Sequence, residues 1–122
     1  MQRTLSKINY RIHTAAIQET LIPPEITRAQ ASQIYASEAD LLNMALFGQT
    51  AKEWRDTHPE ASGNIRDHAA LEQLVVLTNL ESLNAVFIRQ SIEASERLLK
   101  LNEIAISQMR SLVSTQSVKK LK

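Results

Sequence analysis

Apolar residues recur at intervals of three and four along most of this chain, the pattern of helices that turn one face toward a core. Leu5, Ile8 and Ile12 follow this spacing near the start, which predicts an amphipathic helix over residues 4–20. The Pro23-Pro24 pair ends it, because proline has no backbone N–H to donate and disfavours helical geometry in the residue before it. The chain therefore opens with one helix and a sharp stop.

Polar residues mark the ends of the next predicted helices. Thr27 suits the N-cap of a short helix over residues 27–35, and Ser37 suits the N-cap of the apolar helix that follows. Gly48 ends that apolar helix as a left-handed C-cap. Thr50, with a glutamate three residues later, forms a capping box and predicts a further short helix.

The second half of the chain carries two long apolar patterns. Between residues 67 and 89 the apolar positions go nearly all round the helix, so this helix is central or is covered by a partner. Asn64 is its predicted N-cap. A last helix follows over residues 93–113, with its apolar stripe at spacings of three and four.

The predicted fold is all-α: a small helical bundle of about five to six helices built on a long antiparallel C-terminal helix pair. At 122 residues the chain fits a single helical domain over 1–122, with ends that fray at 1–3 and 115–122. Only 2 glycines and 3 prolines occur, which favours helices over a turn-rich sheet protein. Cysteine is absent, which excludes disulfides and thiolate metal sites.

The ends of the chain are basic although the net charge is only +1. Three basic residues precede any acid, and three lysines close the chain. They are either contacts for nucleic acid or solubilising termini. The N-terminus lacks the apolar stretch of a signal peptide and no apolar run is long enough to span a bilayer, so we expect a cytoplasmic protein without a membrane segment. The basic residues are Arg3, Lys7 and Arg11, then Lys119, Lys120 and Lys122.

A series of longer motifs covers about residues 34–110: EADLLNMALFG, TAKEWR, GNIRD, LEQLVVLTNLESLNA and ERLLKLNEIA. In combination these segments resemble the C-terminal region of KilA-N domain proteins, which occur in phages, prophages and bacterial genomes. In that family an N-terminal KilA-N module is thought to bind DNA, and nothing in residues 1–24 resembles that module. The resemblance therefore implies an accessory segment of a phage-related protein, and no residue here inherits a DNA-binding role from it.

Six residues of the predicted central helix are candidates for an interface between two copies. A bundle of this size leaves part of so apolar a helix uncovered, so we expect its leucines and phenylalanine to divide between core and interface. Its two asparagines either fix the register of that interface or form a polar stripe that bonds to the last helix near Asn102. The candidates are Leu77, Leu80, Leu83, Phe87, Asn79 and Asn84.

The segment around the single tryptophan is a second candidate site. Trp54, Arg55 and Arg66 are residue types that are common at recognition hot spots. The alternative is structural: Trp54 packs on the core, and Arg66 pairs with Asp56 or Glu53.

Chemical motifs are scarce. His58, Glu60 and His68 do not have the spacing of a metal site, and the sequence contains no nucleophile elbow, phosphate-binding loop or thiol. We therefore expect no metal, no cofactor and no enzymatic activity.

The predicted function is a non-enzymatic helical interaction or oligomerisation domain of a phage- or mobile-element-related protein. Its expected partner is a second copy in a homodimer, with a DNA-binding module or another protein as a further partner. The alternative is a nucleic-acid-associated regulator that uses the basic N- and C-terminal segments.

Overall fold

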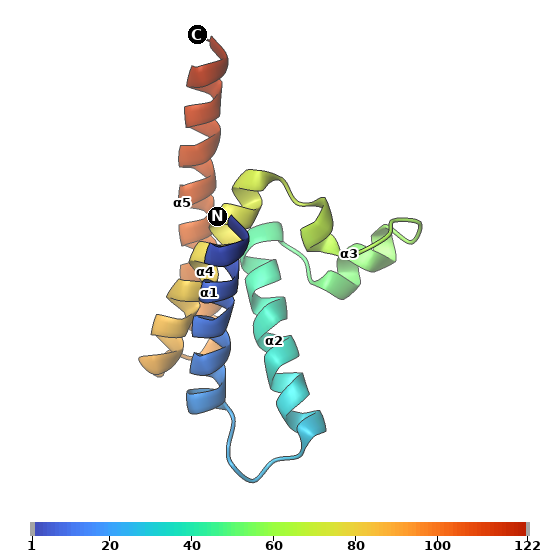
Figure 1. Ribbon diagram of the computed structural model, residues 1–122, viewed down its shortest axis with the longest axis vertical. Helices are drawn as coiled ribbons and strands as arrows, with labels where there is room; N and C mark the ends of the chain where they lie inside the picture. The colour runs from blue at the N-terminus through green and yellow to red at the C-terminus, as the bar shows by residue number, and fades with distance from the viewer. Residues whose placement is uncertain (1, 122) are drawn as a thin grey trace.

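Five α-helices and two shorter helical turns make up the computed structural model of the chain (Figure 1). The structure describes the backbone of residues 2–121 and the side chains of residues 7–113, and this part contains no strand. The all-α prediction is confirmed. The elements are α1 (Gln2–Ala16), the π-helical turn η1 (Ile17–Leu21), α2 (Arg28–Phe47), α3 (Ala51–Thr57), the 3-10 turn η2 (Ile65–His68), α4 (Leu71–Arg89) and α5 (Ala94–Leu121).

The four long helices run alternately up and down, and α4 lies among them. It packs against α1, α2 and α5, while α3 and the loop after it project to one side (Figure 1). A connection of four residues, 90–93, turns the chain from α4 into α5, so these two helices are antiparallel as predicted. The end of α5 extends past the other helices (Figure 1).

Two apolar clusters hold the bundle together. The larger one joins α2, α4 and α5, and the smaller one joins α1 and η1 to the second half of α4. Burial of these side chains is the main stabilising contribution to the fold. The larger cluster consists of Leu42, Ala45, Val76, Leu77, Leu80, Leu101 and Ala105; the smaller consists of Ala16, Ile17, Ala85 and Ile88.

Two of the predicted helix-end signals are confirmed by the hydrogen bonds they make. The Thr50 side chain accepts from the Glu53 amide at 3.2 Å, and the Glu53 carboxylate accepts from the Thr50 amide at 2.9 Å. Gly48 ends α2 at φ 75°, and its N–H donates to the Met44 carbonyl. Both signals act within one helical turn, which is why they could be recognised locally.

Two predicted helix starts were wrong. Ser37 is not an N-cap, because α2 runs through it from Thr27, whose capping box with Gln30 opens the whole helix. Asn64 caps η2 and not the long helix, which begins seven residues after Asn64 at Leu71. Ser37 could cap a helix, but the stronger cap at Thr27 starts α2 earlier and the helix continues through Ser37. Asn64 does act as a cap, but for the short turn η2 that precedes α4.

The expectation that no apolar run is long enough to span a bilayer needs correction: within the described residues, α4 is long and apolar enough to cross a membrane by length and composition. It packs against α1, α2 and α5, as the core helix of a helical bundle does.

Candidate functional site

A cluster of four buried polar side chains, the buried network, joins all four long helices. It consists of His13 on α1, Glu38 on α2, Asn84 on α4 and Arg97 on α5, and each is at most 5% exposed. Arg97 and Glu38 form a bidentate ion pair: Nη1 donates to Oε1, and Nη2 donates to Oε2 at 3.1 Å. Buried polar groups are costly unless they are paired, and here they pair with one another.

Asn84 is the centre of the buried network, and its partners fix its orientation. Arg97 can only donate, so the Asn84 oxygen faces it and accepts from Nη1 at 3.0 Å. The Asn84 amide nitrogen then donates to Glu38 Oε1 at 3.0 Å and to His13 Nε2 at 2.8 Å. His13 must therefore accept at Nε2, which requires the neutral imidazole with its proton on Nδ1.

The electrostatics agree with this hydrogen-bond order. Burial lowers the pKa of His13 from 6.5 to about 4, opposed by the charge of Glu38 and assisted by the charges of Arg66 and Arg97. Glu81, one helical turn before Asn84 on α4, is 3% exposed. Burial raises the pKa of the Glu81 carboxyl from 4.5 to about 7, against the opposing charge of Arg66. Folding thus favours a neutral imidazole and a protonated carboxyl.

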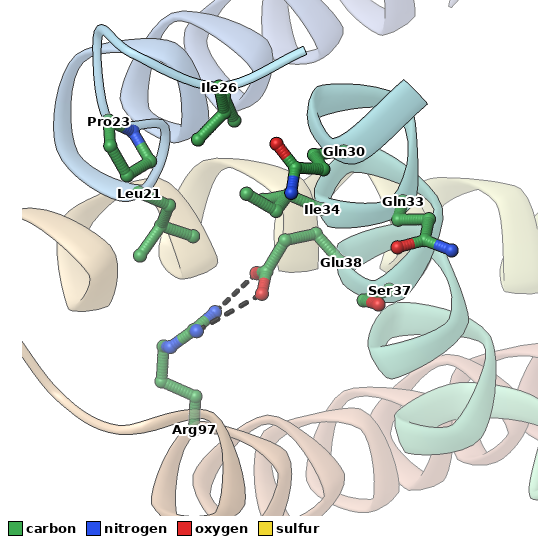
Figure 2. A pocket seen from close by; sticks show the side chains of 9 residues that line it. All are labelled: Leu21, Pro23, Ile26, Gln30, Gln33, Ile34, Ser37, Glu38 and Arg97. Carbon is green, nitrogen blue, oxygen red and sulfur yellow. Dashed lines mark hydrogen bonds and ion pairs between the residues drawn. The ribbon is translucent and has the colours of Figure 1, made fainter. Parts of the chain in front are cut away.

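A groove of about 590 Å³ opens beside the Arg97–Glu38 pair. Figure 2 shows this pair at one side of the groove, with Leu21, Pro23 and Ile26 opposite α2. The remaining lining residues all lie on α2: Gln30, Gln33, Ile34 and Ser37. Because Arg97 and Glu38 are already neutralised by each other, the groove presents mainly apolar walls and amides, and not a free charge.

The segment around Trp54 forms a packed stack. Trp54 is 7% exposed and lies between two imidazoles, with ring centroids 4.7 Å from His58 and 5.1 Å from His68. Arg55 is exposed, while Arg66 is half-buried and pairs with neither Asp56 nor Glu53 among the described residues. The tryptophan packs inward, and the charge of Arg66 acts on His13 and Glu81, so a recognition patch at these three residues stays a prediction.

The predicted interface on the central helix needs correction. Leu77, Leu80 and Asn84 are at most 2% exposed and are covered by the chain's own helices. Leu83 and Phe87 are partly buried and pack against the larger core cluster. Asn79 is exposed and donates to Gln108 of α5 at 3.0 Å, which is the intramolecular alternative. Leu77, Leu80 and Asn84 are therefore no interface residues, because the chain's own helices cover them, while a contact through Leu83 and Phe87 stays a prediction.

Exposed apolar residues gather elsewhere, and the first group is the α5 stripe. It consists of Leu99, Ile106 and Val113, which are 68%, 50% and 51% exposed. Their spacing of seven residues places all three on one side of α5. Asn102, one turn from both Leu99 and Ile106, lies at the edge of the stripe next to α2, where it donates to the Ala45 carbonyl at 2.9 Å.

The second group is the α1–α4 face. An exposed ion pair between Arg89 and Glu19 (2.8 Å) joins α4 to η1, the turn that continues α1. Helical spacing places exposed apolar residues of α4 on the side of Arg89, and exposed apolar residues of α1 on one side of that helix. Next to this face, Lys7 and Arg11 lie exposed one turn apart on α1. The side chains of Arg3 and of the three C-terminal lysines lie outside the described residues. The α1–α4 face consists of Ile8, Ile12, Leu71, Val75 and Val86.

Sequence reasoning missed the buried network because its members lie on four helices, and partners that bond to each other are up to 71 residues apart. The available signal was weak: a histidine, an acid, an asparagine and an arginine that interrupt otherwise apolar helix faces. No model of a known protein family, no curated protein and no solved structure matches this chain.

Proposed function

We propose that this chain is a non-enzymatic helical interaction domain of a phage-related, cytoplasmic protein, and that it forms a homodimer. The observation that carries the proposal is the α5 stripe, three large apolar side chains that are at least half exposed and lie in one line. Aligned apolar groups on a surface helix are typical of a contact with another helix. The phage assignment is supported by the resemblance to KilA-N domain proteins alone.

The polar chemistry of the molecule favours a structural role over a catalytic one. In the buried network, the hydrogen bonds run among its own four side chains and from Arg97 Nε to the Ile92 carbonyl. Such a closed network positions helices and leaves no general base or nucleophile directed at a substrate.

The test is the solution mass, measured by size-exclusion chromatography with light scattering over a range of concentrations. We expect a dimer for the native chain and a folded monomer for Ile106→Glu. The matched control is Val86→Glu, a similar change on the α1–α4 face (Val86 is 48% exposed), which we expect to stay dimeric. A native chain that is monomeric at every concentration would refute the proposal.

A second candidate function is nucleic-acid binding through the basic segments. It is favoured by the exposed Lys7 and Arg11, which lie one turn apart on α1 and have no ion pair among the described residues. Binding of duplex DNA should weaken steeply with salt and should be lost when Arg3, Lys7 and Arg11 are all replaced by alanine. Absence of binding at low salt would remove this candidate.

A further inference from the structure

Two charged residues accompany the α5 stripe on one side. Glu103 and Arg110 are exposed, lie seven residues apart, and follow Leu99 and Ile106 by four residues each. Helical geometry therefore places both along the same edge of the stripe. Neither has an ion pair among the described residues. The stripe thus has an acidic half and a basic half on that edge.

This arrangement is self-complementary about Ile106. Leu99 lies seven residues before it and Val113 seven residues after it, while Glu103 lies three before and Arg110 four after. If two copies of α5 cross antiparallel at Ile106, Leu99 of each copy faces Val113 of the other. The charged edges then lie on the same side of the contact, with each Glu103 next to the other copy's Arg110.

A parallel pairing gains none of these charge contacts. A two-fold axis along the helices places the charged edges of the two copies on opposite sides of the contact. Glu103 and Arg110 of one copy would then lie beside the edge of the other copy that carries Asn102 and Met109. Asn102 already donates to the Ala45 carbonyl, and Met109 packs against the larger core cluster, so neither supplies a charge.

We infer that the partner of the α5 stripe is a second copy of this chain, bound antiparallel with Ile106 at the two-fold axis and with two Glu103–Arg110 pairs. This inference rests on the proposed function and adds the surface, the orientation and the pairing. A homodimer of this kind is isologous, because each residue contact occurs twice.

Charge reversal tests the pairing. Glu103→Arg alone places two positive pairs across the contact, and Arg110→Glu alone places two negative pairs, so each should raise the dimer dissociation constant by about tenfold. Mixing the two variants should restore association, because every pair in the mixed dimer is complementary. A parallel dimer would be insensitive to both substitutions and to mixing the two variants.

Cysteine cross-linking tests the orientation, and the chain contains no cysteine to interfere. In the antiparallel dimer, identical positions at 99 lie 14 residues apart along the helices, about 21 Å. Oxidation of a mixture of Leu99→Cys and Val113→Cys should therefore give a cross-linked dimer, while each variant alone should give none. Circular dichroism confirms that the variants are folded.

The outcomes separate this inference from the proposed function. A Leu99→Cys chain that cross-links to itself would show a parallel dimer and overturn the inference alone. A native dimer that shows neither cross-link nor charge sensitivity would place the contact elsewhere, which also overturns the inference but leaves the proposed function. A monomeric native chain would refute both.

Discussion

At the scale of single residues, the Arg97–Glu38 pair is the most consequential contact of the fold. Removing one member of a buried pair leaves the other charge unpaired, whereas an exposed pair contributes little. Glu38→Gln should therefore lower the free energy of unfolding by about 3 kcal/mol. The control Glu19→Gln breaks the exposed pair with Arg89 and should cost less than about 1 kcal/mol. Urea unfolding followed by circular dichroism measures both, and equal losses would show that burial does not strengthen the Arg97–Glu38 pair.

His13 and Glu81 make opposing contributions to the pH dependence of stability. Folding lowers the pKa of His13. Its contribution to the free energy of unfolding is therefore fully present above pH 6.5 and is lost as the pH falls toward 4. The pKa of Glu81 is raised by folding, so its contribution is present below pH 4.5 and is lost as the pH rises through 7. Between pH 4.5 and 6.5 the native and unfolded chains bind the same number of protons at these two groups, and the effects cancel.

Single substitutions should expose each contribution. With Glu81→Gln, stability should fall as the pH is lowered from 6.5, and with His13→Gln it should fall as the pH is raised from 4.5. Both slopes should be about 1 kcal/mol per pH unit, while the native chain stays nearly flat between these values. The measurement is the free energy of unfolding in urea at a series of pH values. Identical profiles for all three proteins would show that neither group changes its pKa on folding.

The residues of the buried network could not have been predicted from the sequence. Each contact in it joins side chains on different helices, and the spacing between His13 and Asn84 has no local meaning. Polar residues that interrupt an apolar face indicate only that a partner is needed, and not which residue supplies it. The same limit applies to the α5 stripe, because the spacing shows that three residues share a side but not which side is left uncovered.

At the scale of the elements, two glycines with positive φ should differ in their tolerance of a side chain. Gly48 has no atom within 4 Å of an added Cβ, whereas a Cβ at Gly63 would lie 2.4 Å from the Asp67 carboxylate. Gly48→Ala should cost about 1 kcal/mol, from backbone strain alone. Gly63→Ala should cost more, because Asp67 must move and its 2.9 Å bond from the Asn64 amide is lost. Thermal unfolding compares the two, and an equal shift would mean that the η2 cap contributes nothing to stability.

Helix ends were predictable where the signal lies within one turn of the boundary. The Thr50 capping box and the Gly48 C-cap could be read from four residues each, and both are present. Ser37 has the same local chemistry but lies in the middle of α2, between the capping box at Thr27 and Gly48. Continuity across Ser37 is decided by tertiary packing, since Glu38 must reach Arg97 and Leu42 must reach the core from the same helix.

At the scale of the whole molecule, the bundle separates its polar and apolar groups in an unusual way. Charged side chains are buried where the four long helices meet, while large apolar side chains are exposed on α5 and on the α1–α4 face. The buried network favours the observed helix neighbours, because separating them would leave the charges of Arg97 and Glu38 buried and unpaired. The exposed stripes are then left as rigid surfaces, and this rigidity lowers the entropic cost of binding a partner.

Dimerisation through the α5 stripe should make thermal stability depend on concentration. For a dimer that unfolds to two chains, a tenfold rise in protein concentration adds about 0.7 kcal/mol per chain, which corresponds to an increase in Tm of roughly 2–4 °C for a domain of this size. Calorimetry of the native chain at several concentrations should show this shift. Ile106→Glu should abolish the dependence on concentration and melt at a constant Tm, while Val86→Glu should keep it. A native Tm that does not change with concentration would indicate that the helices of one chain account for the whole stability, because association would then add nothing to the native state.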